Sequence, residues 1–220
     1  MIEMFYGMEI ITELDLSNFR TNNVTSMIGL FQNCYSLTNL NLNNFDTTKV
    51  TYMNRMFDSC ISLKSLDISN FKTDSVTDLG SMFQNCSSLT SINLSKFNTS
   101  KSNSMINMFN GCTSLEALNI ENFETPNVKF FSSMFSNWYS LTSLSFPNLK
   151  TTEANSIQNM FYNCSSLTSL YLPFFETNKI ANENIEGAFE NCQKLVLSIK
   201  LEQCSNLIEN IPDYITIIGL

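Results

Sequence analysis

The sequence contains no histidine, and it has only one tryptophan, four prolines and six glycines in 220 residues. Without histidine, the Ser-His-Asp and Cys-His catalytic arrangements are excluded, and so are the mixed Cys/His sites that hold zinc. The glycines are scattered and form no glycine-rich phosphate-binding loop. We therefore expect a protein that is not an enzyme and that binds neither a metal nor a cofactor.

Basic residues are also scarce. The chain carries 12 Lys and Arg against 20 Asp and Glu, which gives a net charge of -8. Binding to nucleic acid, or to the surface of an anionic membrane, requires clusters of Lys and Arg. No apolar run is long enough to span a bilayer. These absences exclude nucleic acid and a membrane span, and they leave a protein or a glycan as the expected partner.

What the sequence has in abundance is a repeat. Residues 82–104, MFQNCSSLTSINLSKFNTSKSNS, are one copy of a unit whose first phenylalanine recurs every 26 residues, with a last step of 28. The phenylalanines of this slot are Phe5, Phe31, Phe57, Phe83, Phe109, Phe135, Phe161 and Phe189. A fixed period of this length predicts a solenoid, in which each coil buries its apolar side only against its neighbours. We expect one elongated domain, with about seven coils over residues 1–195 and a C-terminal cap or junction over residues 196–220.

The repeat also predicts the elements of each coil. The pattern Leu-x-x-Leu-x-Leu, as in Leu37, Leu40 and Leu42, ends in the period-2 alternation of a half-buried strand. Stacked coils would align one such strand per coil into a continuous parallel sheet. The β-branched residues 47–53 predict a second short strand or an extended edge, and residues 54–57 predict a short helix or a turn. Because every apolar slot recurs in register, we expect the phenylalanine rings to stack along a shared core.

The seven cysteines invite a metal or a disulfide interpretation. Six of them occupy one slot of the repeat, namely Cys34, Cys60, Cys86, Cys112, Cys164 and Cys192. Structural metal sites use closely spaced Cys pairs, which are missing, and a ladder points its thiols inward in parallel and not toward one another. Met8 and Trp138 fill the same slot in two coils, which suits an apolar position. We expect reduced thiols in the core, and Cys204, outside the slot, is the one thiol that we expect to be exposed.

The candidate working surface is the outward side of the predicted sheet. The residues that alternate with the strand leucines or follow them should project there; they are Glu13, Asp15, Asn39, Asn41, Asp67, Asn93, Asn119, Glu121 and Tyr171. This face is small, polar and flat, and apart from Tyr171 it lacks the aromatic and arginine side chains of tight interfaces. Two interpretations stay open, a merely solvated sheet face or an extended surface that binds a protein or a glycan through many weak contacts.

The unit as a whole, Met-Phe-x-x-Cys-x-Ser-Leu-x-x-Leu-x-Leu-Ser-x-Phe-x-Thr-x-x-Val-Thr-x-Met, resembles the repeat of the BspA-like leucine-rich repeat surface proteins. The resemblance covers roughly residues 4–195, and residues 56–79 and 82–97 match closely. It implies a leucine-rich-repeat solenoid and a non-enzymatic role. It also implies an extracellular or cell-surface location, with adhesion to host or matrix proteins. No binding residue carries over, because the shared motif is the core.

Alternatives stay open for the cellular location of the protein and for its mode of action. Residues 1–7 do not resemble a secretory signal, and no lipid-attachment cysteine or wall anchor is visible, so a cytoplasmic location stays open. Met4 and Phe5 already fit the repeat, which favours a fragment or a processed product. Instead of a recognition module, the chain could be a scaffold or spacer that self-associates through its solenoid ends.

Overall fold

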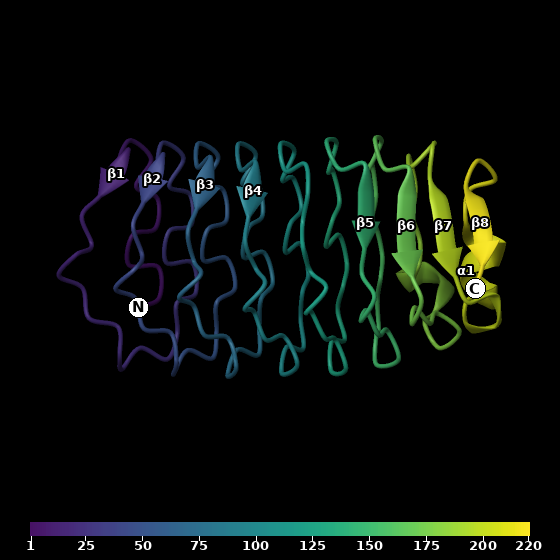
Figure 1. The fold of residues 1–220 in the computed structure, drawn as a ribbon, viewed down its shortest axis with the longest axis horizontal. Coiled ribbons are helices and arrows are strands. Elements are labelled where there is room, and N and C mark those ends of the chain that lie inside the picture. The colour runs from purple at the N-terminus through teal and green to yellow at the C-terminus, as the bar shows by residue number, and fades with distance from the viewer.

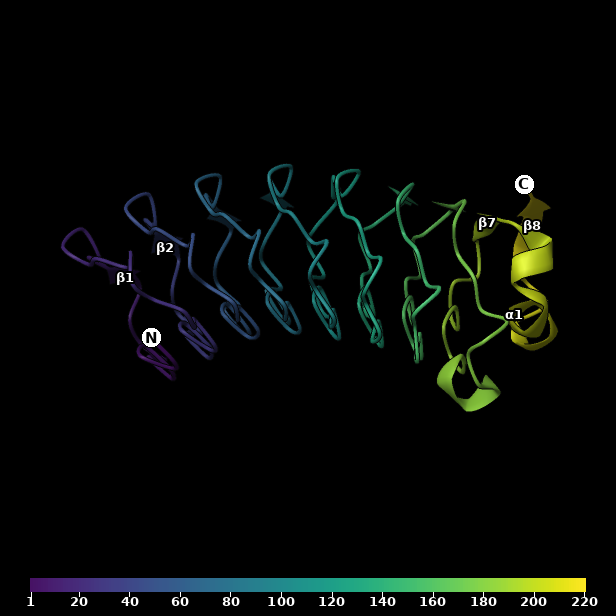
Figure 2. The same cartoon turned by 90° about the horizontal axis from the view of Figure 1, so that it is seen from below.

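The computed structural model describes residues 1–220 and is a stack of coils that runs from the N-terminus at one end to the C-terminus at the other (Figure 1). Seen from below, the stack is gently arched (Figure 2). Each coil lies beside the next one in sequence, and every strand pairing is parallel. The predicted solenoid with parallel strands stacked coil upon coil is therefore confirmed.

The strands fall in the slot that the leucine pattern predicts. They are β1 (Glu13–Leu14), β2 (Asn39–Leu40), β3 (Ser65–Leu66), β4 (Ser91–Ile92), β5 (Ser143–Ser145), β6 (Ser169–Leu172), β7 (Val196–Ile199) and β8 (Thr216–Gly219). Hydrogen bonds group them into three sheets, β1-β2, β3-β4 and β5-β6-β7-β8. The sheet is thus most regular toward the C-terminus. The coil between β4 and β5 carries Leu118 and Ile120 in the same slot without a formal strand.

The second expected strand is reduced to a single bridged residue in each coil. Parallel bridges connect the following residues in series: Ser26, Tyr52, Asp78, Ser104, Phe130 and Ser156. Each of these bridges joins residues that are 26 positions apart, so the slot is one of the repeat. The second strand or extended edge predicted over residues 47–53 is thus confined to the last residues of that range, because residues 47–50 form a turn in which the Val50 amide donates to the Thr47 carbonyl (2.9 Å).

The segment beside each anchor phenylalanine is a turn and not a helix. Helical residues occur only in η1 (Asn182–Asn184), η2 (Leu201–Gln203) and α1 (Ser205–Asn210). Of the two predicted alternatives, the turn is correct. The reason is that two residues of each segment have positive φ, as Ser81 (56°) and Asn85 (55°) do, and a right-handed helix does not accept this conformation.

We call these five-residue segments the turn segments. They are residues 3–7, 29–33, 55–59, 81–85, 107–111, 133–137, 159–163 and 187–191, and each begins and ends with a positive-φ residue. Their amides donate forward to the next coil, for example from Ser81 to Ile106 (2.7 Å), from Phe83 to Met108 (3.0 Å) and from Asn85 to Asn110 (2.7 Å). Asn, Ser and Gly dominate the end positions because they tolerate the left-handed region best.

The core is one cluster of 64 buried residues that follows the length of the stack. The rings of the anchor phenylalanines stack on one another with centroids 5.1–5.8 Å apart and interplanar angles of 5–13°. The expected stacking along this slot is confirmed. In the second phenylalanine slot only Phe97 and Phe123 stack, at 6.5 Å, so that slot contributes mainly area burial.

All seven cysteines are free and buried. The thiol of each slot cysteine donates to the carbonyl of the anchor phenylalanine one coil earlier, as Cys86 does to Phe57 (3.2 Å), and Trp138 substitutes by donating its indole Nε1–H to the Leu115 carbonyl. The expectation that Cys204 is exposed is wrong. Cys204 is fully buried, because the chain folds back over the end of the core and the thiol donates to the carbonyl of Phe175 (3.2 Å).

Residues 196–220 continue the stack. β7 pairs in parallel with β6, and β8 pairs in parallel with β7. Between these strands, η2 and α1 cover the end of the core, where Leu207 and Cys204 are buried. The division of the chain into two parts at residue 195 stays a prediction. β7 lies just after that residue, and it pairs with β6 at the strand position of the repeat.

Candidate interaction surface

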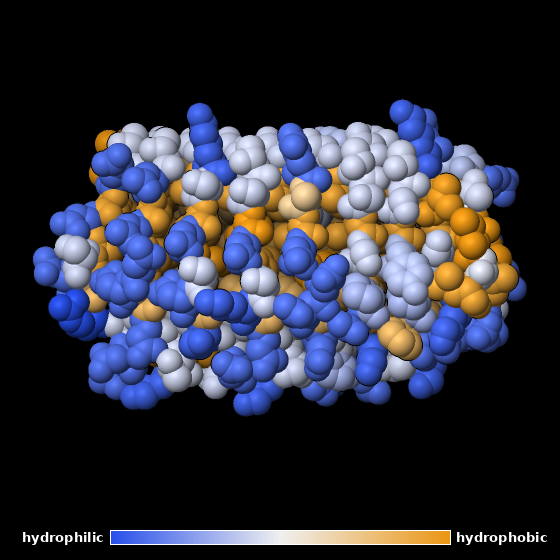
Figure 3. Space-filling model, in the orientation of Figure 1, coloured by the Kyte–Doolittle hydropathy of each residue, from blue (hydrophilic) through white to orange (hydrophobic).

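The outward side of the sheets is the surface on which the sequence places the candidate binding residues. Inward residues such as Leu40, Leu66 and Leu170 are buried, and their neighbours face solvent. All nine candidate residues are exposed: Glu13, Asp15, Asn39, Asn41, Asp67, Asn93, Asn119, Glu121 and Tyr171. In Figure 3 polar side chains stand in rows over most of this side, which we call the sheet face.

One row of the sheet face has a structural role within its own coil. The side-chain oxygens of five residues accept a hydrogen bond from the amide two residues later, at 3.0–3.1 Å; these residues are Asp15, Asn41, Asp67, Asn93 and Asn119. An Asx turn of this kind directs the chain out of the strand. Each of these five side chains therefore has one oxygen bound to the backbone. Its other polar atom is left for solvent or a partner.

The same turn sets the charge of the two acids in that row. The amide of Ser17 lowers the pKa of Asp15, and the amide of Ser69 lowers the pKa of Asp67. Hydrogen bonds to a carboxylate stabilise its charged form. Both side chains are therefore anionic at neutral pH, and they give the sheet face fixed negative charges.

The other four candidate residues are free of such bonds. The side chains of Glu13, Asn39, Glu121 and Tyr171 make no hydrogen bond to the rest of the chain. They are available to a partner without breaking an internal contact. Glu13 and Asn39 are neighbours across the β1-β2 pair.

At the C-terminal end of the sheet face, the predicted residue Tyr171 is joined by Phe174, Lys200 and Ile218, which the repeat pattern did not predict. Tyr171 of β6 lies in register with Ser198 of β7 and with Ile218 of β8, and Ile218 is 48% exposed. Phe174 is 44% exposed just after β6, and the Lys200 ammonium lies 5.4 Å from the centroid of its ring. We call Tyr171, Phe174, Lys200 and Ile218 the C-terminal patch.

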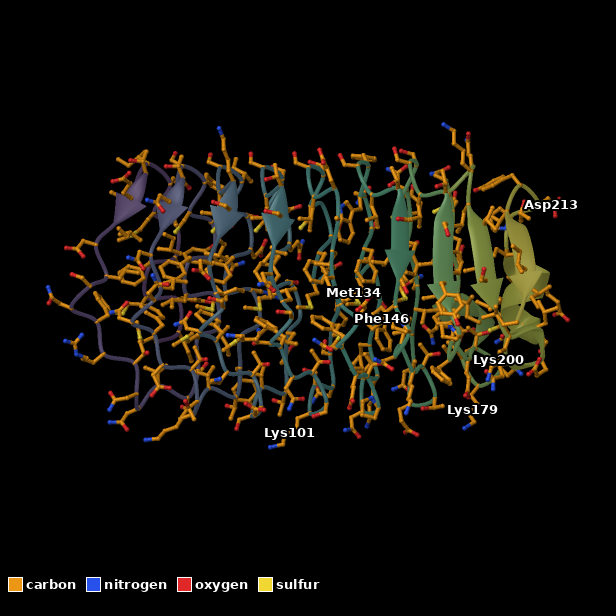
Figure 4. The ribbon with its side chains drawn as sticks, viewed as in Figure 1. Lys101, Met134, Phe146, Lys179, Lys200 and Asp213 are labelled. Atoms are coloured by element: carbon orange, nitrogen blue, oxygen red, sulfur yellow. The ribbon has the colours of Figure 1, made fainter.

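The strands β6, β7 and β8, from which the C-terminal patch projects, lie at the C-terminal end of the stack (Figure 1). Apolar colouring gathers over β7 and β8 in Figure 3, and Figure 4 places Lys200 near the ends of these strands. The signal for β7 was present in the sequence, since Val196, Leu197 and Ile199 have strand-like spacing. The signal for β8 was hidden, because residues 214–220 fit no slot of the repeat.

The sheet face offers two kinds of chemical group. Its polar part offers amides, hydroxyls and carboxylates at regular intervals, and its C-terminal patch offers two aromatic rings, a branched aliphatic side chain and one cation. Aromatic side chains are the commonest energetic centres of protein interfaces, and they also stack on other flat groups.

The fold and this surface define a leucine-rich-repeat type of solenoid. The chain matches the family model described as Mycoplasma protein of unknown function, DUF285, over residues 1–118, 65–174 and 90–203. Together these matches span most of the sequence, so the chain belongs to this family.

A search of curated proteins finds no match. Among solved structures, the chain is similar to a leucine-rich repeat protein from Bacteroides ovatus, with 16% sequence identity and a TM-score of 0.49. That alignment covers 100% of this chain and 62% of the other, so the chain spans less than two thirds of the length of that protein. In this fold no helix has the length and apolar character needed to cross a membrane.

Proposed function

We propose that the protein is a non-enzymatic interaction module that binds a protein or a glycan through its sheet face, with the C-terminal patch as the centre of binding. One observation carries this proposal. Tyr171, Phe174 and Ile218 are exposed together at the end of an otherwise polar face, although the repeat places small polar residues at this position in earlier coils.

The polar rows extend the same surface. Glu13, Asp15, Asp67 and Glu121 give it negative charge, and the Asn side chains at positions 39, 41, 93 and 119 add donors and acceptors. A partner that covers the patch and continues along the rows would bury aromatic area and form hydrogen bonds at the strand spacing, which is about 4.8 Å. A protein or glycan with basic or hydroxyl-rich groups has this chemistry.

The test compares two tyrosines on different sides of the solenoid. Tyr171→Ala removes a ring of the patch, and Tyr52→Ala removes a similarly exposed ring from the bridged edge. Immobilised matrix proteins and a glycan array serve as probes, with binding measured by biolayer interferometry. We expect at least one ligand whose affinity falls roughly tenfold or more in Tyr171→Ala and is unchanged in Tyr52→Ala. Equal affinity of all three chains for every ligand that binds would contradict the proposal.

We further propose that the protein acts outside the cell or at its surface. The resemblance of its repeat to that of the BspA-like surface proteins supports this location, and so does an exterior rich in hydroxyl and amide groups. Protease treatment of intact cells that express the protein checks the proposal. We expect loss of the protein without loss of a cytoplasmic marker, and full protection of the chain would contradict a surface location.

A scaffold function is the second candidate, and the first coil favours it. Ile2, Met4 and Tyr6 are 51–58% exposed, whereas residues equivalent to Met4 in later coils, such as Leu30 and Met56, are buried. An apolar coil end of this kind can bury itself against a second copy. Light scattering over a concentration series decides: mass that grows with concentration supports the scaffold, and a monomer at every concentration contradicts it.

A further inference from the structure

The last turn segment, near the C-terminus, has backbone amides that no further coil binds. In every coil up to residues 159–163, the first, third and fifth amides of a turn segment donate to carbonyls of the next coil. Asn159 donates to Glu186 (3.0 Å), Phe161 to Ala188 (2.8 Å) and Asn163 to Glu190 (2.8 Å). In the last turn segment the amides of Gly187 and Phe189 have no acceptor, and the amide of Asn191 is bound by the Tyr214 hydroxyl at 2.8 Å.

The missing acceptors have a simple origin in chain length. Residues 173–195 connect β6 to β7, but only residues 200–215 connect β7 to β8, so the last connection is seven residues shorter. The missing length is about that of a turn segment with its flanking residues. α1 and residues 211–215 cross this end of the molecule, and Figure 2 shows α1 and β8 closing the stack.

A cavity of about 460 Å³ lies where the missing segment would be. One wall is the last turn segment, with Gly187 and Phe189, and the other is formed by Leu207, Ile211 and Tyr214. The cavity is half apolar, and Phe189 is only 1% exposed. Gly187 is partly exposed, and both residues line the cavity, so a carbonyl that enters the cavity can accept from their free amides.

We propose that this cavity is a docking site for a short, turn-forming segment of another polypeptide, which completes the turn segments in place of the missing one. The partner segment presents two carbonyls two residues apart to the amides of Gly187 and Phe189. It places an apolar side chain against Ile211 and Leu207. The other coils define this chemistry, since Ile106 and Met108 provide the same pair of carbonyls to Ser81 and Phe83.

The occupant is a free segment and not a whole coil of a second copy. In each coil a turn segment is followed by a strand, and the position of the next strand is already taken by β8, which pairs with β7. A complete coil docked at the cavity would therefore collide with β8. This site is separate from the sheet face, so its test is independent of the test of the function proposed above.

The test uses the full chain and a short peptide. The probe is the acetylated and amidated peptide with the sequence of residues 105–111, Met-Ile-Asn-Met-Phe-Asn-Gly. The control peptide has Val in place of the residue that corresponds to Asn107, because a β-branched residue disfavours the positive φ of that position. Fluorescence anisotropy measures the affinity, and amide NMR of the labelled chain reports the site.

We expect saturable binding of the probe, binding weakened roughly tenfold or more for the control peptide, and slowed hydrogen exchange at Gly187 and Phe189. The chain variant Ile211→Arg should lose the probe, whereas Tyr171→Ala should bind it like the wild type. No binding, or binding that leaves both amides unchanged, would overturn the proposal. Should Ile211→Arg fail to fold, the exchange of the two amides in the wild-type chain decides alone.

Discussion

Thr73 and Asn98 are bound to each other twice across neighbouring coils. The Thr73 hydroxyl donates to the Asn98 carbonyl at 2.9 Å and accepts from the Asn98 amide at 2.7 Å. The same pair of hydrogen bonds recurs at 26-residue steps. It joins Thr47 to Lys72 in the preceding coils and Thr99 to Glu124 in the following ones. One buried hydroxyl per coil thus satisfies two backbone groups that have no strand partner.

Replacing this hydroxyl by a methyl group should therefore be costly. We expect Thr73→Val to lower the free energy of unfolding by about 1–3 kcal/mol, because it removes both hydrogen bonds of a buried hydroxyl, while the backbone groups of the exposed Asn98 can still bind water. Thr73→Ser keeps the hydroxyl and should lose only about 1 kcal/mol for the buried methyl group. Urea titration followed by circular dichroism measures the stability of both variants. Equal losses would show that the two hydrogen bonds of the Thr73 hydroxyl contribute nothing to stability.

The stacked rings make a second prediction. The rings of Phe57, Phe83 and Phe109 are fully buried and stacked at 5.6–5.7 Å. We expect Phe83→Ala to destabilise the protein by about 3–5 kcal/mol through lost area and a cavity between two coils. Phe130→Ala, at a ring that is 39% exposed, is the matched control and should cost clearly less than Phe83→Ala, because less apolar area is lost and no closed cavity forms. An unchanged urea midpoint for Phe83→Ala would contradict a shared core.

Cys112 and Cys204 should be inert in the folded protein. Burial raises the pKa of the Cys204 thiol to about 11 and that of the Cys112 thiol to about 12. Since the thiolate is the reactive form, roughly one Cys204 thiol in a thousand is reactive at pH 8. We expect iodoacetamide to leave both cysteines unmodified in buffer and to modify both in urea, as measured by mass spectrometry. Rapid labelling of Cys204 in buffer would mean that the C-terminal segment opens.

The core of the fold could be predicted from the sequence because the repeat averages out local ambiguity. A single Leu-x-Leu pair is weak evidence for a strand, but Leu40, Leu66 and Leu144 in one slot leave little choice. The turn segments were harder to predict. Met56 and Phe57 are compatible with a helical turn, and only the recurrence of Asn, Ser or Gly four residues apart, as at Ser81 and Asn85, indicates positive φ.

The functional surface was predictable only in part, because it lies partly outside the repeat. Asp15, Asn41 and Asp67 could be placed on the sheet face, but their Asx turns depend on a backbone that the pattern does not specify. Ile218 and Phe174 join Tyr171 because β8 pairs with β7, and that pairing arises from a segment that matches no repeat slot. Burial of Cys204 has the same origin.

Asp58 gives a prediction about pH. Its carboxylate is buried near the back of the third coil, where it accepts hydrogen bonds from Gln32 Nε2 and from the Ser59 hydroxyl, both at 2.9 Å. Burial raises the pKa of Asp58 above its ordinary value of 3.8 despite these bonds. The folded state therefore holds this proton more tightly than the unfolded state. The contribution of Asp58 to stability is largest below pH 3.8 and is lost as the pH rises through the folded pKa.

Asp58→Asn should remove this loss, because neighbouring coils hold neutral amides at the same slot, Gln32 and Gln84. We expect the variant to match the wild type in acid and to become more stable than the wild type as the pH rises toward neutrality. Asp46→Asn is a control for which the pH dependence of stability should have the opposite sign. Hydrogen bonds from Thr48 lower the pKa of Asp46, so its contribution is present at neutral pH and is lost in acid. Urea midpoints of the three chains from pH 3 to pH 7 measure both slopes. Parallel curves for Asp58→Asn and the wild type would mean that the carboxylate is solvated in the folded protein.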